Sequence, residues 1–167
     1  MDFLELAGRR HSCRAFSPRQ LSRETLTAIL EAGRLAPTAK NLQEQRVYVI
    51  QSEEGLGRID KLTPCRYGAP TVIVVAFDRR NVFTYPGGKR DSGIEDATIV
   101  ATHMMLAAAD LGVDSCWINF LDPEETRKEL GLPENEEVLM FLDLGYAAGD
   151  KDAAKKRKAL EETVSYM

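Results

Sequence analysis

The sequence has few of the cysteines and histidines that metal-binding and disulfide-bonded proteins require. Its 167 residues include only three cysteines and two histidines. Cys13, Cys65 and Cys116 lie too far apart for paired metal-ligand spacing, and an odd number does not fit a disulfide framework. No His-x-x-x-His or Cys-x-x-Cys pair occurs, so no metal site is expected. We therefore expect reduced thiols in a cytoplasmic protein.

Long apolar runs and an excess of positive charge are also missing. The longest apolar run, Val72 to Phe77, is far shorter than the ~20 residues of a membrane-spanning helix. The first ten residues carry charge within their only apolar patch, which predicts neither a signal peptide nor export. The net charge is −4 and the pI about 5.3. No overall basic field therefore exists to bind nucleic acid.

Neither the glycine-rich dinucleotide fingerprint nor the P-loop pattern occurs. Gly88-Lys89 is followed by Arg90, and Phe83 stands where a P-loop would begin with glycine. A Rossmann dehydrogenase and a P-loop NTPase are both disfavoured. What is present is 44% hydrophobic and 29% charged residues, which suits a single domain over 1–167.

Capping residues and apolar spacing predict three helices. Ser22 caps an amphipathic helix over 23–35. A second helix, over 94–111, has so many apolar residues that we expect it to be buried nearly all round. Asp122-Pro123 begins a third, short helix that Gly131 closes.

Four β-rich runs and one long loop complete the expected organisation. The run 71–77 is continuously apolar and predicts a central strand. The other strands are expected at 47–50, 113–120 and 138–144. The loop 78–93 is long for a compact domain, which favours a lid or a binding loop.

Three polar clusters could carry chemistry. The first, Arg9 to Phe16, holds several guanidiniums with an imidazole and a hydroxyl, which suits an anion site. The second, Pro37 to Gln43, offers amides and a hydroxyl that could read a heteroaromatic edge. The third is a basic tail formed by Lys151, Lys155, Lys156, Arg157 and Lys158. Taken singly, each cluster also has a simpler interpretation: the first as a solvated turn, the second as a loop and the third as a soluble tail.

Taken together and in order, these clusters resemble the flavin-dependent nitroreductase family over essentially the whole chain. The matching pieces are Arg10–Phe16, Ala36–Gln43, Asp96–Ala101, Leu111–Ile118, Leu144–Tyr146 and Arg157–Glu162. The resemblance implies an α+β fold with a mostly antiparallel central sheet flanked by helices. It also implies an intertwined homodimer, with FMN at each of two interface sites and the helix over 94–111 as a dimerisation element.

The resemblance assigns the basic residues to the cofactor. Arg10 and Ser12 match residues that bind the FMN phosphate, and Arg14 matches one that reaches the pyrimidine edge of the isoalloxazine. Lys155 and Arg157 match a C-terminal basic pair on the same phosphate.

The second cluster matches a segment that the partner subunit places over the flavin. Pro37, Thr38, Ala39 and Asn41 belong to it, and Gln43 matches the polar residue that follows. The resemblance therefore places them in the cofactor site of the neighbouring subunit.

Ile118 and Asn119 match the stretch whose backbone lies against the flavin ring, so that an amide near Asn119 would hydrogen-bond flavin N5. His11 also lies within a matching motif. It is either a flavin-site residue or a residue that hydrogen-bonds at a helix end. His103, inside the apolar helix, is expected to be a satisfied structural histidine.

The chain departs from the family pattern at two places. Glu44-Gln45 replaces the Pro-Trp that often follows the matching glutamine, which affects the expected interface packing. Asn119-Phe120 stands where the family often has glycine, which affects the substrate side of the flavin.

The activity implied is that of an FMN-dependent oxidoreductase without a catalytic side chain. Hydride would pass from NADH or NADPH through flavin N5 to a nitroaromatic, quinone or similar small acceptor, by a ping-pong mechanism. Three alternatives stay open. They are another reduced-flavin reaction such as dehalogenation or flavin fragmentation, a flavin-binding protein with negligible turnover, and nucleic-acid binding by the tail, which the acidic balance disfavours.

Overall fold

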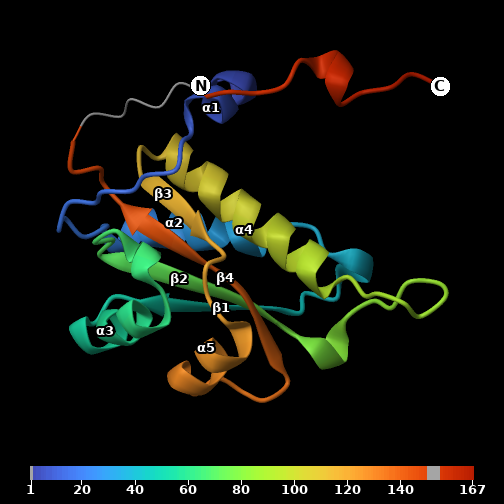
Figure 1. Ribbon diagram of the computed structural model, residues 1–167, viewed down its shortest axis with the longest axis horizontal. Coiled ribbons are helices and arrows are strands. Elements are labelled where there is room, and N and C mark those ends of the chain that lie inside the picture. Colours follow the sequence, from blue (N-terminus) through green and yellow to red (C-terminus); the bar gives the residue numbers. More distant parts are fainter. Residues whose placement is uncertain (1, 150–154) are drawn as a thin grey trace.

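The computed structural model describes residues 2–149 and 155–167. Within these residues the chain forms five α-helices and four strands of an α+β fold (Figure 1). In chain order they are α1 Phe3–Arg9, α2 Arg23–Arg34, β1 Gln45–Ile50, α3 Glu53–Leu62, β2 Thr71–Asp78, α4 Gly93–Asp110, β3 Asp114–Ile118, α5 Pro123–Leu130 and β4 Glu136–Gly145.

The sheet has the strand order β1-β2-β4-β3, and every neighbouring pair is antiparallel. All eight residues of β2 are buried, which confirms the central strand expected from its continuous apolar run. The antiparallel α+β architecture implied by the family resemblance is confirmed as well.

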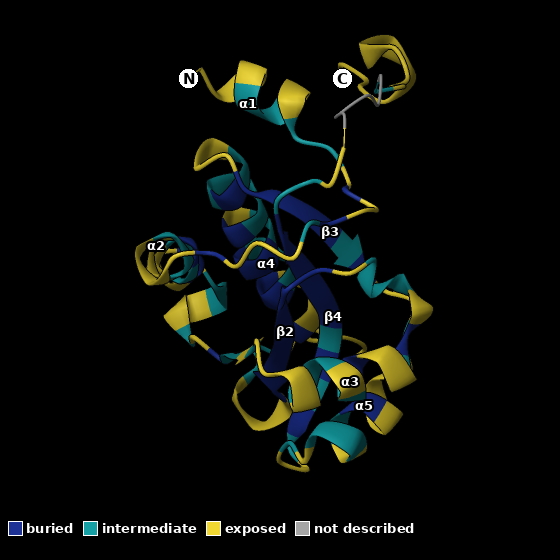
Figure 2. Ribbon diagram, turned by 90° about the vertical axis from the view of Figure 1, so that its left-hand side faces the viewer, coloured by how far each residue is buried: buried dark blue, intermediate teal, exposed yellow. Residues whose placement is uncertain are grey.

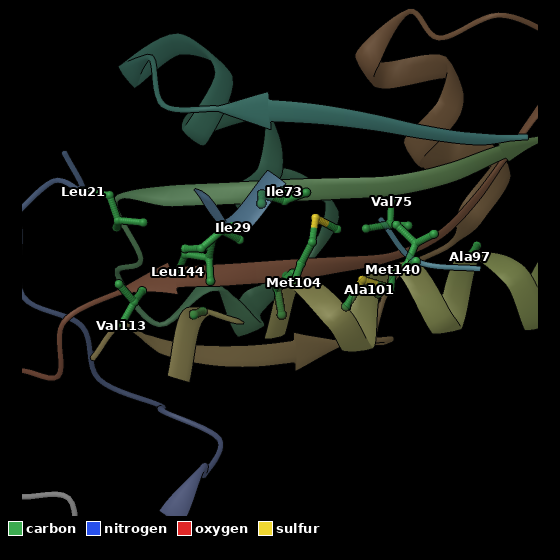
Figure 3. Close-up of a cluster of buried hydrophobic side chains, with 14 of the residues drawn as sticks. Leu21, Ile29, Ile73, Val75, Ala97, Ala101, Met104, Val113, Met140 and Leu144 are labelled. Atoms are coloured by element: carbon green, nitrogen blue, oxygen red, sulfur yellow. The ribbon is translucent and has the colours of Figure 1, made fainter. Parts of the chain in front are cut away.

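Helices cover both faces of the sheet. Alternate residues of β2 point to opposite faces, so Ile73 and Val75 pack with α2 and α4 while Val72 and Val74 belong to the core beneath α3. On the α4 face, Met104 meets residues of β2 and β4 in a continuous apolar layer (Figure 3). This layer fixes α4 along the sheet, and the two ends of α4 carry the candidate site residues described below.

Local capping explains where two of the helices begin and end. The Ser22 hydroxyl accepts a hydrogen bond from the Thr25 backbone N–H at 3.1 Å, as the predicted cap requires. In α5, Asp122 accepts from the Glu125 N–H at 2.8 Å, and Gly131 ends the helix in the left-handed region at φ 69°. Both helices therefore lie where the sequence predicts them, to within one residue.

The expectation that the helix over 94–111 is buried nearly all round is wrong for the isolated chain. Val100, Ala101 and Met104 are buried against the sheet, whereas Ile94 is 54% exposed and His103 is exposed. In Figure 2 the ribbon of α4 is coloured as buried in some places and as intermediate or exposed in others. A helix presents only one side to the sheet that it covers, so part of the opposite side of α4 is left uncovered by the described residues. The ring of His103 instead bonds within the helix, with Nδ1 2.9 Å from the Ile99 carbonyl oxygen.

Strand boundaries differ from the prediction by up to two residues: β1 begins at Gln45 and β4 at Glu136. β3 ends at Ile118 rather than at residue 120, and the Phe120 side chain is 71% exposed. The loop 78–93 is ordered by a bridge between Thr84 and Asp91. Among the helices of residues 2–149 and 155–167, none has the length and apolar character that crossing a membrane requires.

Candidate functional site

Segment 10–14 runs beside the edge of β3. α1 ends at Arg9, with Arg10 as its C-cap, and Ser12 then forms a parallel bridge with Ser115. The backbone N–H of Cys13 donates to the Ser115 carbonyl at 2.9 Å. Backbone pairing with the sheet therefore holds Arg10, Ser12 and Arg14 in a defined order along one strand edge.

Three cations gather where α1 meets the C-terminal segment. Lys155 donates a hydrogen bond to the Ala7 carbonyl in α1. The pKa of Lys155 is lowered by burial and by the positive charges of Arg10 and Arg157. Within residues 2–149 and 155–167, no carboxylate forms an ion pair with any of the three. We name Arg10, Lys155 and Arg157 the basic cluster. Lys151 of the predicted tail lies outside the described residues.

His11 lies beside the carboxylate of Asp114. Its Nε2 lies 3.9 Å from Asp114 Oδ1, and the other oxygen of Asp114 accepts from the Ala147 N–H at 2.9 Å. A cavity of about 160 Å³ adjoins this pair, with Arg10 and Asp110 in its lining. His11 thus joins segment 10–14 to the end of β4 through Asp114.

Arg14 is exposed and lies beside a group that the sequence did not single out. The pKa of Tyr67 is raised chiefly by its hydrogen bond to Cys65, while Arg14 acts on it in the opposite direction. Cys116, on the neighbouring β3, has its pKa raised to about 11, chiefly by burial, which keeps it a neutral thiol. Cys116 is therefore suited to packing in the core rather than to reaction as a thiolate.

Segment 37–43 has an unusual backbone that side chains hold in place. Lys40, Asn41 and Gln43 all have positive φ, of 52°, 56° and 54°, which is uncommon for residues other than glycine. The Thr38 hydroxyl accepts a hydrogen bond from the Gln43 N–H at 3.0 Å. The Ala39 N–H donates to Asp96 Oδ1 in the first turn of α4 at 2.9 Å. Pro37 is exposed.

The structure does not bring segments 10–14 and 37–43 together within one chain. Ala39 is bonded to Asp96 near the beginning of α4, whereas Arg10 shares a cavity with Asp110 at its end. The helix between those two positions extends about 20 Å. A single chain therefore carries the two predicted parts of the site near opposite ends of α4.

Ile118 and Asn119 lie at the end of β3. Ile118 is buried and pairs with Phe141 of β4. Asn119 follows it on the surface, where its side-chain oxygen accepts a hydrogen bond from the Trp117 indole N–H. This contact fixes the direction in which the chain leaves the strand.

Two relationships escape sequence reasoning. Glu44 and Asp96 are two buried carboxyl groups that interact with each other although they belong to different predicted elements. Asp143 is fully buried in β4, and burial raises its pKa to about 8. The one signal for Asp143 is a single carboxylate inside the otherwise apolar run 138–144.

The fold is thus α+β, with a cation-rich surface near one end of α4 and a separate polar segment near the other. The model of the nitroreductase family matches residues 7–65 and 61–146. The chain belongs to the nitroreductase family.

Solved structures and a named relative agree with this membership. A nitroreductase family protein from Clostridium difficile 630 is 38% identical, covers 99% of this chain and 98% of its own, and superposes with a TM-score of 0.95. A nitroreductase with bound FMN from Bacteroides fragilis NCTC 9343 is 28% identical over 98% of this chain and 97% of its own, with a TM-score of 0.75. An Archaeoglobus fulgidus protein, named as an NADH dehydrogenase/NAD(P)H nitroreductase, is 31% identical over 89% of this chain and 87% of its own.

Proposed function

We propose that this chain is an FMN-dependent oxidoreductase that passes hydride from NADH or NADPH to a nitroaromatic, a quinone or a similar small acceptor. When bound, FMN supplies the reactive atom, N5, and a ping-pong order follows if donor and acceptor use the same flavin face in turn. The names of the relatives and the FMN bound by one of them support this proposal.

The observation that carries the proposal is the basic cluster. Arg10, Lys155 and Arg157 lie close enough for Arg10 and Arg157 to lower the pKa of Lys155. Like charges brought together repel each other, and no described carboxylate is ion-paired with them. A phosphate dianion would relieve this repulsion with charge-assisted hydrogen bonds, and Ser12 nearby can add a hydroxyl donor. The residues therefore fit the phosphate of FMN.

Arg14 has the right character for the other end of the cofactor. Its guanidinium is exposed beside Tyr67. Arg14 belongs to the same segment beside β3 as Arg10 of the basic cluster. A cation at the pyrimidine edge of a bound flavin raises its reduction potential, because it favours the added negative charge. Arg14 would thus tune the potential, and Arg10 would retain the cofactor.

We also propose that the active species is a homodimer. Segments 10–14 and 37–43 lie at opposite ends of α4, so neither subunit alone forms a closed site. The outer side of α4 carries the exposed Ile94 and the half-buried Met105 and Leu106. A two-fold partner packed on this side would cover the apolar surface and place its own segment 37–43 over the first subunit's cations. We propose a cytoplasmic location, in keeping with the reduced cysteines expected from the sequence.

The first experiment is the visible spectrum of the freshly purified protein, followed by titration with FMN. A flavin spectrum with one FMN per chain would support the proposal. A colourless protein that retains no flavin after incubation with FMN and gel filtration would refute it. Oxidation of NADH and of NADPH is then measured with menadione or nitrofurazone as acceptor. Flavin binding without turnover of either donor would instead favour a flavin-binding protein.

A further inference from the structure

Two buried carboxyl groups meet beneath segment 37–43. Glu44, which follows the segment directly, is 0% exposed, and Asp96 in the first turn of α4 is 4% exposed. Asp96 Oδ1 accepts the Ala39 N–H at 2.9 Å, and the Ser92 hydroxyl lies 3.4 Å from Glu44 Oε1. The second oxygen of each carboxyl has no N–H or O–H partner among the described residues. Each carboxyl group therefore has a hydrogen-bond partner for one of its oxygens only.

The Asp96 carboxyl acts directly on that of Glu44, and a proton held between the two would give each unpaired oxygen a partner. Burial, and after it the neighbouring Asp96 carboxyl, raise the pKa of Glu44 to about 7. Near pH 6 the pair therefore holds one proton and one negative charge. The amide of Ala39 and the beginning of α4 stabilise that single charge.

Among the described residues, no cation forms an ion pair that would compensate a second charge on Glu44 and Asp96. The charged and titratable groups around the pair come from segment 37–43, β1, β2, the loop before α4 and α4 itself: Lys40, Arg46, Asp78, Tyr85, Asp91 and Glu95. Arg46 donates to the Glu44 backbone carbonyl at 3.3 Å, and its ion pairs are with Asp78 and Glu136. Within residues 2–149 and 155–167, Glu44 and Asp96 form no ion pair. Loss of the shared proton leaves two adjacent buried negative charges.

The segment above the pair needs this support. Three of its residues other than glycine adopt positive φ, and each such residue costs free energy that other contacts have to supply. The bond from Ala39 to Asp96 is one of those contacts, and it ties the middle of the segment to α4. A change in the charge of the pair therefore acts directly on the segment.

We propose that Glu44 is a positioning residue, which by sharing one proton with Asp96 holds segment 37–43 in the shape that covers the flavin, and that the segment loosens when this proton is lost. The role toward the flavin rests on the proposed function. The effect on the segment does not, because its contacts all lie within one chain.

The first test follows hydrogen exchange of segment 37–43 in the cofactor-free protein, at pH 6 and pH 8.5, in the wild type and in Glu44→Gln. Glutamine is neutral and can donate to Asp96 at both pH values, so it imitates the protonated pair. Comparing the two proteins at the same pH cancels the intrinsic pH dependence of exchange. We expect equal rates at pH 6 and about tenfold faster exchange in the wild type at pH 8.5. Equal rates at both pH values would overturn the proposal.

Two further variants separate this effect from general destabilisation. Asp96→Asn keeps an oxygen that can accept from the Ala39 N–H but removes the second charge. Hydrogen exchange of segment 37–43 in this variant is therefore also expected not to depend on a shared proton. Asp143→Asn removes a buried carboxyl that belongs to the opposite core, and is expected to keep the wild-type difference between pH 6 and 8.5. If Asp143→Asn removes that difference as well, the assignment to Glu44 is wrong.

FMN affinity supplies the second readout. In the wild type, the Kd for FMN is expected to rise about tenfold between pH 6 and pH 8.5, while in Glu44→Gln it stays constant. A purely structural role would weaken binding equally at both pH values. If the wild type binds no FMN but its segment exchanges as expected, the proposed function fails and the role of Glu44 in holding the segment stands. The same pH dependence of Kd in both proteins would contradict the role toward the flavin.

Discussion

Lys155 donates a hydrogen bond from its ammonium group to the backbone carbonyl of Ala7, 148 positions earlier in the chain. This contact brings the C-terminal segment onto α1 and places Lys155 beside Arg10. Cations from both ends of the sequence thus share one place on the surface. We expect these cations to bind the phosphate of FMN.

Arg10→Ala is expected to weaken FMN binding at least tenfold, because a charge-assisted hydrogen bond contributes about 1.5–3 kcal/mol. Riboflavin has no phosphate, so its affinity should stay the same. Titration of each protein with both flavins measures the difference. Arg9→Ala is the matched control, since Arg9 is exposed and pairs with Glu5 at 3.6 Å. An equal loss for riboflavin and FMN would remove Arg10 from the phosphate site.

Ile94→Glu is expected to shift the protein from dimer to monomer, because it places a charge on the apolar outer side of α4, where Ile94 is 54% exposed. Sedimentation velocity at several protein concentrations measures this, with the conservative Ile94→Val as control. FMN affinity should fall together with dimer content. A variant that remains dimeric and binds FMN normally would show that this side of α4 is not the interface.

The Glu44 pair also affects stability against pH. The pKa of Glu44 rises from 4.5 in the unfolded chain to about 7 in the folded protein, so between these values the folded state binds more protons. Its contribution is fully present below pH 4.5 and is lost as the pH rises through 7, by at most about 3 kcal/mol. Urea unfolding of Glu44→Gln should therefore lack this part of the pH dependence. A slope as steep as that of the wild type would contradict the shared proton.

Asp143→Asn tests a second buried carboxyl by the same measurement. Burial raises the pKa of Asp143 to about 8, and neither of its oxygens has a hydrogen-bond partner among the described residues. The wild type should therefore lose stability as the pH rises toward 8, and the variant should become the more stable of the two at pH 9, by on the order of 1 kcal/mol or more. The prediction is wrong if the stability of the variant, measured relative to that of the wild type, is lower at pH 9 than at pH 5.

Gly93→Ala should destabilise the fold by about 1–3 kcal/mol, because a Cβ at this first residue of α4 would overlap the Phe77 ring in the core. Gly57→Ala in α3 is the control. It meets nothing within 4 Å and should stabilise by about 0.5–1 kcal/mol through helix propensity. Denaturant unfolding of both variants measures the contrast. If Gly93→Ala stabilises the protein and Gly57→Ala destabilises it, the contact with Phe77 does not limit position 93.

Several features could be predicted from the sequence because their causes are local. A capping hydroxyl at Ser22, the Asp122-Pro123 start and a glycine at Gly131 each act within one helical turn. The uninterrupted apolar run of β2 required a strand covered on both faces. α1 and α3 were not predicted, and α3 carries two glycines that weaken its helical signal.

The residues of the candidate site were also identifiable one by one, through the family resemblance. Sequence order placed Arg10, Ser12 and Arg14 in one segment and Lys155 in another. It did not show that Lys155 and Arg10 are neighbours, because that depends on how the C-terminal segment returns to α1.

By itself, the sequence determined the local elements, the family and the chemical types available for a phosphate and a flavin. The tertiary structure alone decided which of those groups meet. It buried Glu44 against Asp96, left Asp143 without a hydrogen-bond partner among the described residues and set segments 10–14 and 37–43 at opposite ends of α4. The physical reason is that proton sharing, charge repulsion and burial depend on distances in space, which residues far apart in the chain acquire only when the sheet and α4 pack together.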